Sequence, residues 1–116
     1  MLTISTINRI VNDIAPTSAT LTRVGIIGSY ATGENTSESD VDLVFDTGGK
    51  LIDEAVMTAG LQIKAILSDQ FNTQTDIVNY HTILNKCNND KCCHHLETLG
   101  YKHMLESLIW IWRKTV

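Results

Sequence analysis

Two aspartates separated by one residue, Asp40 and Asp42, have the spacing of a metal site. They stand at the start of an apolar run, where two nearby carboxylates repel each other and are costly to bury without compensation. In an extended strand, residues two apart point to the same face and lie roughly 6.5 to 7 Å apart, so both carboxylates can serve Mg²⁺ ions in one site. An isolated D-x-D pattern is more often a solvated strand end, and that alternative stays open on these two residues alone.

A turn of small residues precedes the two aspartates. Gly28 follows an apolar run and lets a ligand approach the backbone, while Ser29 begins a short segment whose free N–H groups can receive an anion. Ser39, directly before Asp40, is a third candidate for nucleotide contact. Because an acidic site repels phosphate, it accepts a nucleoside triphosphate only through bridging cations.

The patterns of apolar residues predict the elements that hold these groups. Strands are expected at residues 21–27, 41–45 and 75–80, the last with Asp76 near its start. Helices are expected at residues 5–14, with Ser5 or Thr6 as the N-cap, and at 51–68, either as one helix or as two short helices interrupted near Gly60. Helical structure is also expected from residue 82 to a final helix over 101–112. One helical turn is expected at 30–33. The predicted fold class is α/β (α+β), a small mixed β-sheet covered by helices.

Length and composition limit the function classes. A chain of 116 residues forms one domain, predicted here as residues 1–116 with a core at about 5–80 and a C-terminal helical segment at about 82–116. No apolar run reaches membrane-spanning length and no signal-peptide pattern begins the chain, so we expect a cytoplasmic protein. The net charge of -4 argues against non-specific nucleic-acid binding, and three cysteines argue against a disulfide framework.

The run GSYATGENTSESDVDLVF joins the turn and the aspartates in one order, with ten residues between Ser29 and Asp40. It resembles the signature of the polymerase-beta-like nucleotidyltransferases. The likeness is greatest to their smallest members, the minimal nucleotidyltransferase (MNT) domains that pair with HEPN proteins, and it extends over about residues 5–80. The resemblance implies the polymerase-beta-like nucleotidyltransferase fold.

The resemblance also implies a role for each candidate residue. Gly28 and Ser29 would hold the triphosphate of ATP, the expected substrate. Asp40 and Asp42 would bind Mg²⁺, with two ions in the site. Asp76 stands where the family has its third carboxylate, so it would complete the metal site and help activate the attacking hydroxyl.

The function implied is transfer of AMP from Mg-ATP to a hydroxyl of a partner protein. MNT domains of this size resemble the antitoxin half of HEPN/MNT toxin–antitoxin pairs, in which the acceptor is a tyrosine of the HEPN ribonuclease. Many relatives have an arginine where this chain has Thr32. A second hypothesis is therefore a non-catalytic subunit that neutralises its partner by binding it. A third, transfer to a small antibiotic, is weaker because such enzymes resemble two-domain proteins.

The C-terminal part of the chain carries two further patterns. A cluster of thiols and imidazoles has residue types that could ligate zinc, but its spacing favours a partly buried helix: Cys87, Cys92, Cys93, His94, His95 and His103. Trp110 and Trp112 lie in an apolar end that is either core or an interface with a partner or a second copy. Tyr30 either stacks on a base or packs under its loop.

Overall fold

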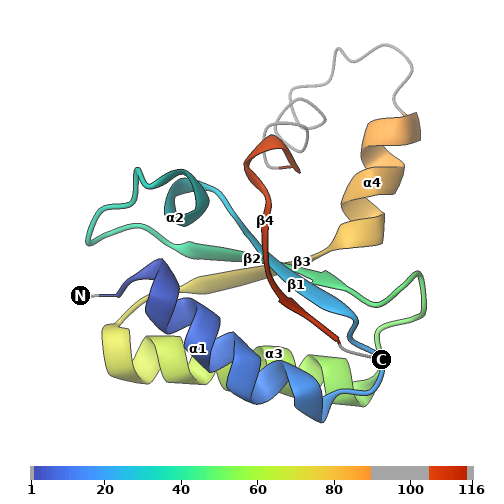
Figure 1. The fold of residues 1–116 in the computed structure, drawn as a ribbon, viewed down its shortest axis with the longest axis horizontal. Helices are drawn as coiled ribbons and strands as arrows, with labels where there is room; N and C mark the ends of the chain where they lie inside the picture. The colour runs from blue at the N-terminus through green and yellow to red at the C-terminus, as the bar shows by residue number, and fades with distance from the viewer. Residues whose placement is uncertain (1, 90–104, 115–116) are drawn as a thin grey trace.

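The computed structural model describes residues 2–89 and 105–114, whose strands form a four-stranded mixed sheet. The strands are β1 (Arg23–Ile27), β2 (Val41–Asp46), β3 (Thr75–Asn79) and β4 (Ile109–Arg113), in the order β3-β2-β1-β4. Strand β2 runs antiparallel to β1 and parallel to β3, and β4 runs antiparallel to β1 (Figure 1). The predicted α+β class and mixed sheet are confirmed.

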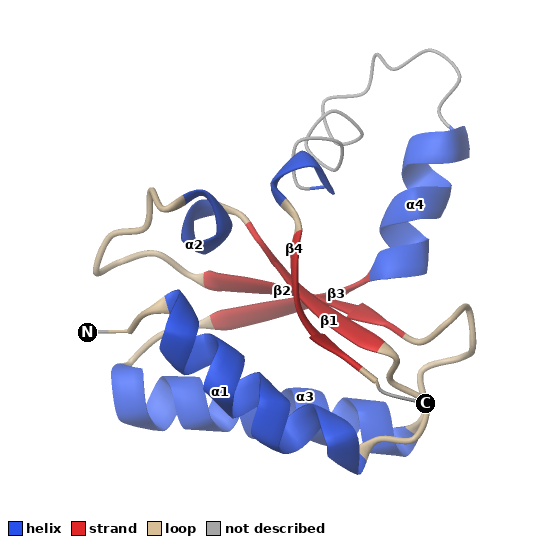
Figure 2. Cartoon of the chain, viewed as in Figure 1, coloured by secondary structure: helices blue, strands red, loops and turns tan. Residues whose placement is uncertain are grey.

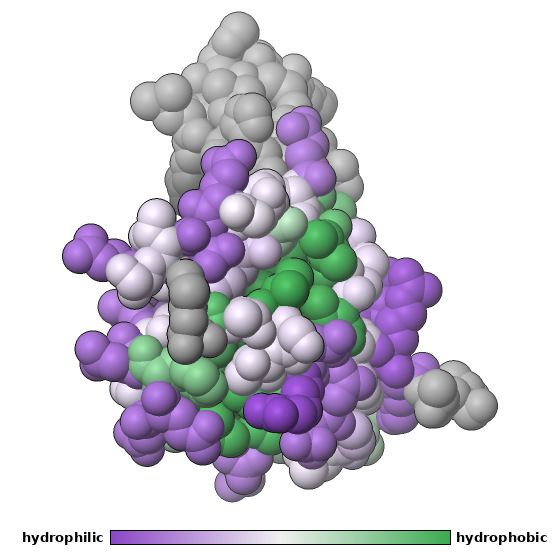
Figure 3. All heavy atoms as spheres, turned by 60° about the vertical axis from the view of Figure 1, so that its left-hand side comes forward, coloured by the Kyte–Doolittle hydropathy of each residue, from purple (hydrophilic) through white to green (hydrophobic). Residues whose placement is uncertain are grey.

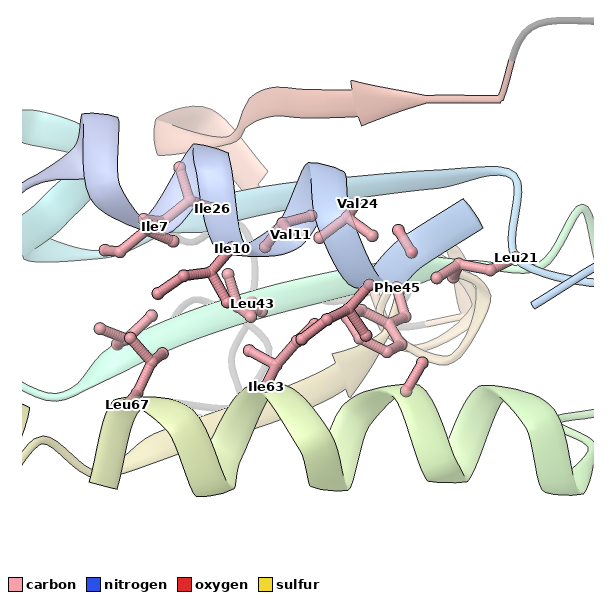
Figure 4. Packing of buried hydrophobic residues seen from close by; sticks show 14 of the residues in the cluster. Ile7, Ile10, Val11, Leu21, Val24, Ile26, Leu43, Phe45, Ile63 and Leu67 are labelled. Atoms are coloured by element: carbon pink, nitrogen blue, oxygen red, sulfur yellow. The ribbon is translucent and has the colours of Figure 1, made fainter. Parts of the chain in front are cut away.

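Two helices, α1 (Ile4–Ile14) and α3 (Glu54–Phe71), lie together on one face of the sheet (Figure 2). Because side chains alternate along a strand, Val41, Leu43 and Phe45 of β2 all point to this face and are buried. Figure 4 shows the core between the sheet and the helices, to which both helices and the two central strands contribute. Each fully buried aliphatic side chain contributes about 1.5–3 kcal/mol to folding, so this layer holds the sheet in place.

Both long helices begin at a capping side chain, although not always the expected one. The N-cap of α1 is Thr3, whose Oγ1 accepts the Thr6 N–H at 3.2 Å, so the predicted caps Ser5 and Thr6 are wrong by two or three residues. The N-cap of α3 is Asp53, and its Oδ1 accepts the Val56 N–H at 3.0 Å. Side-chain oxygens at these positions satisfy N–H groups that the helix leaves free.

Of the two alternatives expected near Gly60, the structure shows the single helix, because α3 continues through Gly60 as one helix of 18 residues. A Cβ atom at Gly60 would lie 3.1 Å from Ile77 Cδ1 and 3.6 Å from Phe45 Cε2. The glycine therefore allows close packing of the helix on β2 and β3, and does not interrupt the helix. A helix interior tolerates glycine at a cost of about 1 kcal/mol when packing recovers it.

The opposite face of the sheet carries the shorter elements. They are α2 (Ser29–Thr32), which follows β1, and α4 (Tyr80–Asn89), which follows β3, while the 3-10 turn η1 (Ala15–Thr17) ends α1. Figure 1 shows α4 on the side of the sheet away from α1 and α3. Figure 3, in which the left-hand side of Figure 1 comes forward, shows hydrophilic residues around a band of apolar ones. Within the described ranges, no helix is both long and apolar enough to cross a membrane.

The C-terminal prediction needs a correction, because residues expected to end a helix form β4 instead. The sequence IWIWR alternates large apolar residues, which suits a strand as well as a helix face. Pairing with β1 decides between them, since Trp110 lies opposite Gly25. A Cβ at Gly25 would overlap Leu108 Cδ1 and lie 3.1 Å from Trp110 Cε3, so the glycine leaves room for this approach.

Candidate active site

The candidate residues meet at one end of the sheet because of its strand register. Asp42 of β2 lies opposite Ile27, the last residue of β1, so the turn at Gly28 follows directly beside it. On the other side of β2, Asp42 is paired in register with Asp76 of β3. Three segments that are distant in the sequence therefore bring the small-residue turn, the aspartate pair and Asp76 side by side.

The Asp42 carboxylate lies where a side chain at Gly28 would come close to it. The backbone at Gly28 has φ 77° and ψ -152°, a region that is essentially restricted to glycine. A Cβ atom added there would lie 2.8 Å from Asp42 Oδ2. The missing side chain therefore leaves the space into which the Asp42 carboxylate projects.

The electrostatic surroundings of Asp42 are unbalanced. Partial burial raises the pKa of its carboxyl above the ordinary value of 3.8, and the negative charges of Asp76 and then Asp40 raise the pKa further. Asp40 and Asp76 are themselves exposed, whereas Asp42 is half-buried. A cation bound here would relieve this repulsion, which is the electrostatic property expected of a metal-binding carboxylate.

The carboxylate oxygens of the candidate residues are suitable ligands for magnesium, although the residues do not form a ready-made metal site. Within residues 2–89 and 105–114, no three or more His, Cys, Asp or Glu side chains form a group that could hold a metal ion. Mg²⁺ is commonly bound through one or two carboxylates, with waters and substrate phosphates completing the octahedron. The pair Asp40 and Asp42 supplies the two carboxylates. Because no group of three ligands is preformed among the described residues, metal binding by Asp40, Asp42 and Asp76 stays a prediction.

The remaining predicted residues have different surroundings. Ser29 begins α2 and is half-buried, and its carbonyl accepts the Glu34 N–H at 2.9 Å. The Ser39 hydroxyl accepts the Thr36 N–H at 2.8 Å, so it closes the loop before the aspartates. Tyr30 is buried in the core, which leaves packing under the loop as its role. Thr32 is exposed at the end of α2.

One residue at this turn was missed by sequence reasoning. The Gly28 N–H donates to Ser107 Oγ at 3.1 Å, across 79 positions of the sequence. Ser107 lies just before β4, and the pairing of β4 with β1 carries it to the turn. The sequence holds no local signal for this contact, because it depends on a strand pairing that was predicted as a helix.

A second charged group occupies the other end of the same strand. Asp46 is 4% exposed and accepts from Arg23, with Oδ2 2.8 Å from Nε and 2.7 Å from Nη2. His81 Nε2 lies 3.1 Å from its Oδ1. Arg23 also stacks on Trp110, with 3.9 Å from its guanidinium carbon to the ring centroid. Trp110 is therefore engaged within the domain.

The predictions for the C-terminal cluster fall largely outside the described residues. Cys92, Cys93, His94, His95 and His103 all lie there, and so does the predicted helix around residues 91–99. The side chain of Cys87 is also outside the description. The association of two copies through C-terminal helices stays a prediction, with the correction that residues 109–113 are a strand.

Solved structures of toxin–antitoxin complexes have a similar fold. A toxin–antitoxin with AMP-PNP is 16% identical, with a TM-score of 0.57 over 93% of this chain and 73% of that one. A mutant MntA–HpeT complex is 13% identical, with a TM-score of 0.58 over the same shares. A tri-AMPylated Shewanella oneidensis HEPN toxin in complex with MNT antitoxin gives 13% identity, a TM-score of 0.51 and coverage of 93% and 70%. At these identities the likeness concerns the fold.

Sequence comparison with families is more decisive than comparison with individual proteins. No curated protein has a significant sequence match to this chain. The family described as "Polymerase beta, Nucleotidyltransferase" matches residues 10–96, which include the turn and all three candidate carboxylates. That match spans most of the chain and agrees with the sheet order and the structural neighbours. The chain belongs to the polymerase beta nucleotidyltransferase family.

Proposed function

We propose that this protein transfers AMP from Mg-ATP to a hydroxyl group of a partner protein, and that the partner is a HEPN-type toxin for which it acts as antitoxin. The observation that carries the proposal is the position of Asp42. Its carboxylate touches the glycine turn on one side and is in register with Asp76 on the other, with unbalanced negative charge around it. A site of this kind calls for a cation and a phosphate together.

In the proposed reaction the chain's own residues orient the two substrates. The backbone at Gly28 and Ser29 would hold the triphosphate, and Asp40 and Asp42 would hold Mg²⁺. Bound Mg²⁺ would neutralise charge on the phosphate oxygens. The acceptor oxygen forms a bond to the α-phosphorus while the bond from that phosphorus to the bridging oxygen breaks, and pyrophosphate leaves. Asp76 takes the proton of the acceptor hydroxyl.

The nucleotide and the partner are suggested by proteins of the same fold. One structural neighbour is a toxin–antitoxin with AMP-PNP, and another contains a tri-AMPylated HEPN toxin with its MNT antitoxin. Both the adenine nucleotide and the protein acceptor come to this chain by analogy, so they require direct measurement.

The test is a mass measurement on the acceptor. The protein is incubated with Mg-ATP and a HEPN-type protein from the same genome, and the intact mass of that protein is followed. We expect a gain of one or more AMP groups that requires Mg²⁺ and disappears in an Asp40→Asn variant. No gain with the wild-type protein, or an equal gain with Asp40→Asn, would contradict the proposal.

A second candidate function is neutralisation of the partner by binding alone. It is favoured by the Gly28 N–H, which Ser107 already engages, and by Thr32, where many relatives have an arginine. Under this hypothesis an Asp42→Ala variant still protects cells from the toxin. Under the enzymatic hypothesis the same variant binds the toxin but no longer protects.

A further inference from the structure

The order of the strands determines on which side of the candidate site each substrate would lie. The glycine turn lies at the end of β1, the aspartate pair at the start of β2 and Asp76 at the start of β3. Attacking and leaving oxygens lie roughly in line across a transferred phosphoryl group. If the triphosphate is held at the β1 side, pyrophosphate leaves on that side and the acceptor has to approach from β3. Strand β3 is an edge of the described sheet, so its outer side pairs with no strand among the described residues.

A polar cavity lies on that side of the sheet. Its volume is about 490 Å³, within the range of ligand-binding sites. It is formed where α3 ends and β3 begins, and its lining includes Lys64, Ser68, Asn72, Gln74, Thr75 and Asp76. Asp76, the residue proposed to take the acceptor's proton, therefore lines this cavity.

The lining has hydrogen-bonding and charge capacity that the described part of the chain leaves unused. Thr75 is 5% exposed, and its Oγ1 is buried without a hydrogen-bond partner. Lys64 forms no ion pair within the described residues, whose two salt bridges both involve Asp46. A buried hydroxyl without a hydrogen-bond partner destabilises the fold, and this hydroxyl belongs to a residue that lines the cavity.

We propose that this cavity, the acceptor cavity, binds the polypeptide segment that carries the acceptor hydroxyl. The hydroxyl side chain lies at Asp76, and a carboxylate of the same segment pairs with Lys64. The outer edge of β3, which pairs with no described strand, provides backbone groups for an extended segment, as in other complexes in which a peptide joins a sheet edge. The proposal rests on the proposed function, because it assigns the second substrate of the same reaction.

The test separates acceptor binding from nucleotide binding. Lys64→Glu reverses the charge of the acceptor cavity, and Lys50→Glu makes the same change on an exposed lysine after β2, at the opposite end of the sheet. With the HEPN-type partner as acceptor, we expect Lys64→Glu to raise KM for the partner about tenfold and to leave KM for Mg-ATP unchanged. Lys50→Glu should match the wild-type protein in both. Thermal unfolding of each variant checks that it is folded.

Two results would overturn the acceptor cavity. One is equal KM for the partner in Lys64→Glu and Lys50→Glu, and the other is a change in KM for Mg-ATP instead. If the wild-type protein transfers nothing, the proposed enzymatic function is wrong. In that case the affinity for the partner, measured without nucleotide, tests whether the acceptor cavity binds it. Weaker binding by Lys64→Glu than by Lys50→Glu supports it, and equal binding overturns it. A partner that the wild-type protein does not bind overturns both proposals.

Discussion

Asp42 and Asp46 lie on the same strand and point to the same face of the sheet, yet their surroundings are opposite. Burial and the charges of Asp76 and Asp40 raise the pKa of Asp42. Burial alone would also raise the pKa of Asp46, but the Gly48 N–H, the hydrogen bond and charge of Arg23 and the charge of His81 outweigh it, so its pKa is lowered. The charge of Asp46 is balanced by Arg23 and His81, whereas the charges that act on Asp42 are those of two other carboxylates.

The difference comes from the strand that pairs with β2. Opposite Asp46, β1 places Arg23, whose guanidinium is held by stacking on Trp110. Opposite Asp42, β1 places Ile27, and Gly28 follows with no side chain at all. A protein that only needed stability would balance both ends, because uncompensated charge is costly. The unbalanced end is therefore the better candidate for function.

The largest expected effect is the loss of transfer in Asp42→Asn. Removing a carboxylate that is proposed to hold the metal should lower the transfer rate roughly 10³-fold, equivalent to ~4 kcal/mol of transition-state stabilisation. Asp46→Asn, the same change at the balanced end, should retain transfer when assayed well below its unfolding temperature. Equal losses in the two variants would remove the functional distinction between the two ends.

The next effect concerns stability, for which Asp46→Asn should lose more than Asp42→Asn. Asp46→Asn breaks a buried ion pair with Arg23, and because Arg23 is partly exposed we expect a loss of about 2–3 kcal/mol in the free energy of unfolding. Asp42→Asn removes repulsion and should leave the protein as stable or more stable. Urea denaturation of the two variants beside the wild-type protein measures both changes.

A third prediction tests the contact between the turn and the carboxylate. Gly28→Ala imposes a Cβ at Asp42 Oδ2 and should weaken Mg-ATP binding by about 1–2 kcal/mol, together with a loss of stability. Gly33 also has a positive φ, 80°, but a Cβ there meets nothing within 4 Å. Gly33→Ala should therefore lose stability and keep its affinity for Mg-ATP in calorimetric titrations. A similar loss of affinity in both would show that backbone strain alone is responsible.

The pH dependence of stability should differ in sign between the two ends. The pKa of Asp42 is raised in the folded protein, so its ionisation costs stability as the pH rises above the ordinary value of 3.8 and through the raised pKa. The pKa of Asp46 is lowered, so it contributes stability above 3.8 that is lost as the pH falls through the lowered pKa. Stability curves of Asp42→Asn and Asp46→Asn against the wild-type curve should diverge in opposite directions towards neutral pH and converge in acid.

The smallest expected effect is at Ser107. Its hydroxyl accepts the Gly28 N–H, which a phosphate oxygen would otherwise engage. Removing this competitor in Ser107→Ala should tighten Mg-ATP binding two- to fivefold, about 0.5–1 kcal/mol, measured by titration. Weaker binding instead would mean that Ser107 itself contacts the nucleotide.

Local patterns predicted much of this molecule. Period-two and helical spacing placed α1, β1, β2 and β3 within two residues of their observed bounds. The alternation along β2 also predicted that Asp40 and Asp42 share a face, whereas the candidate role of Asp76 came from the family resemblance; the register of β2 and β3 pairs Asp76 with Asp42. These features follow from the chain's own periodicity, because side chains alternate along a strand and neighbouring strands pair residue by residue.

Non-local features were not predictable in the same way. The apolar run at residues 109–113 fits a helix and a strand equally well, and only its pairing with β1 decides for β4. The sequence leaves open whether Gly60 interrupts the helix. The packing of Ile77 and Phe45 close to Gly60 gives the glycine a role within a continuous helix. The identity of a neighbour across the sheet is information that no local pattern contains.

The sequence alone therefore determined the family, the mixed sheet and the residue types available for metal and phosphate. The tertiary structure decided which carboxylate is balanced and which is not. Asp42 and Asp46 are the same residue in the same strand, and their difference arises from β1, whose side chains supply a cation to one and only Ile27 and Gly28 to the other. Charge balance depends on distances between residues far apart in the chain, and those distances exist only once the sheet has formed.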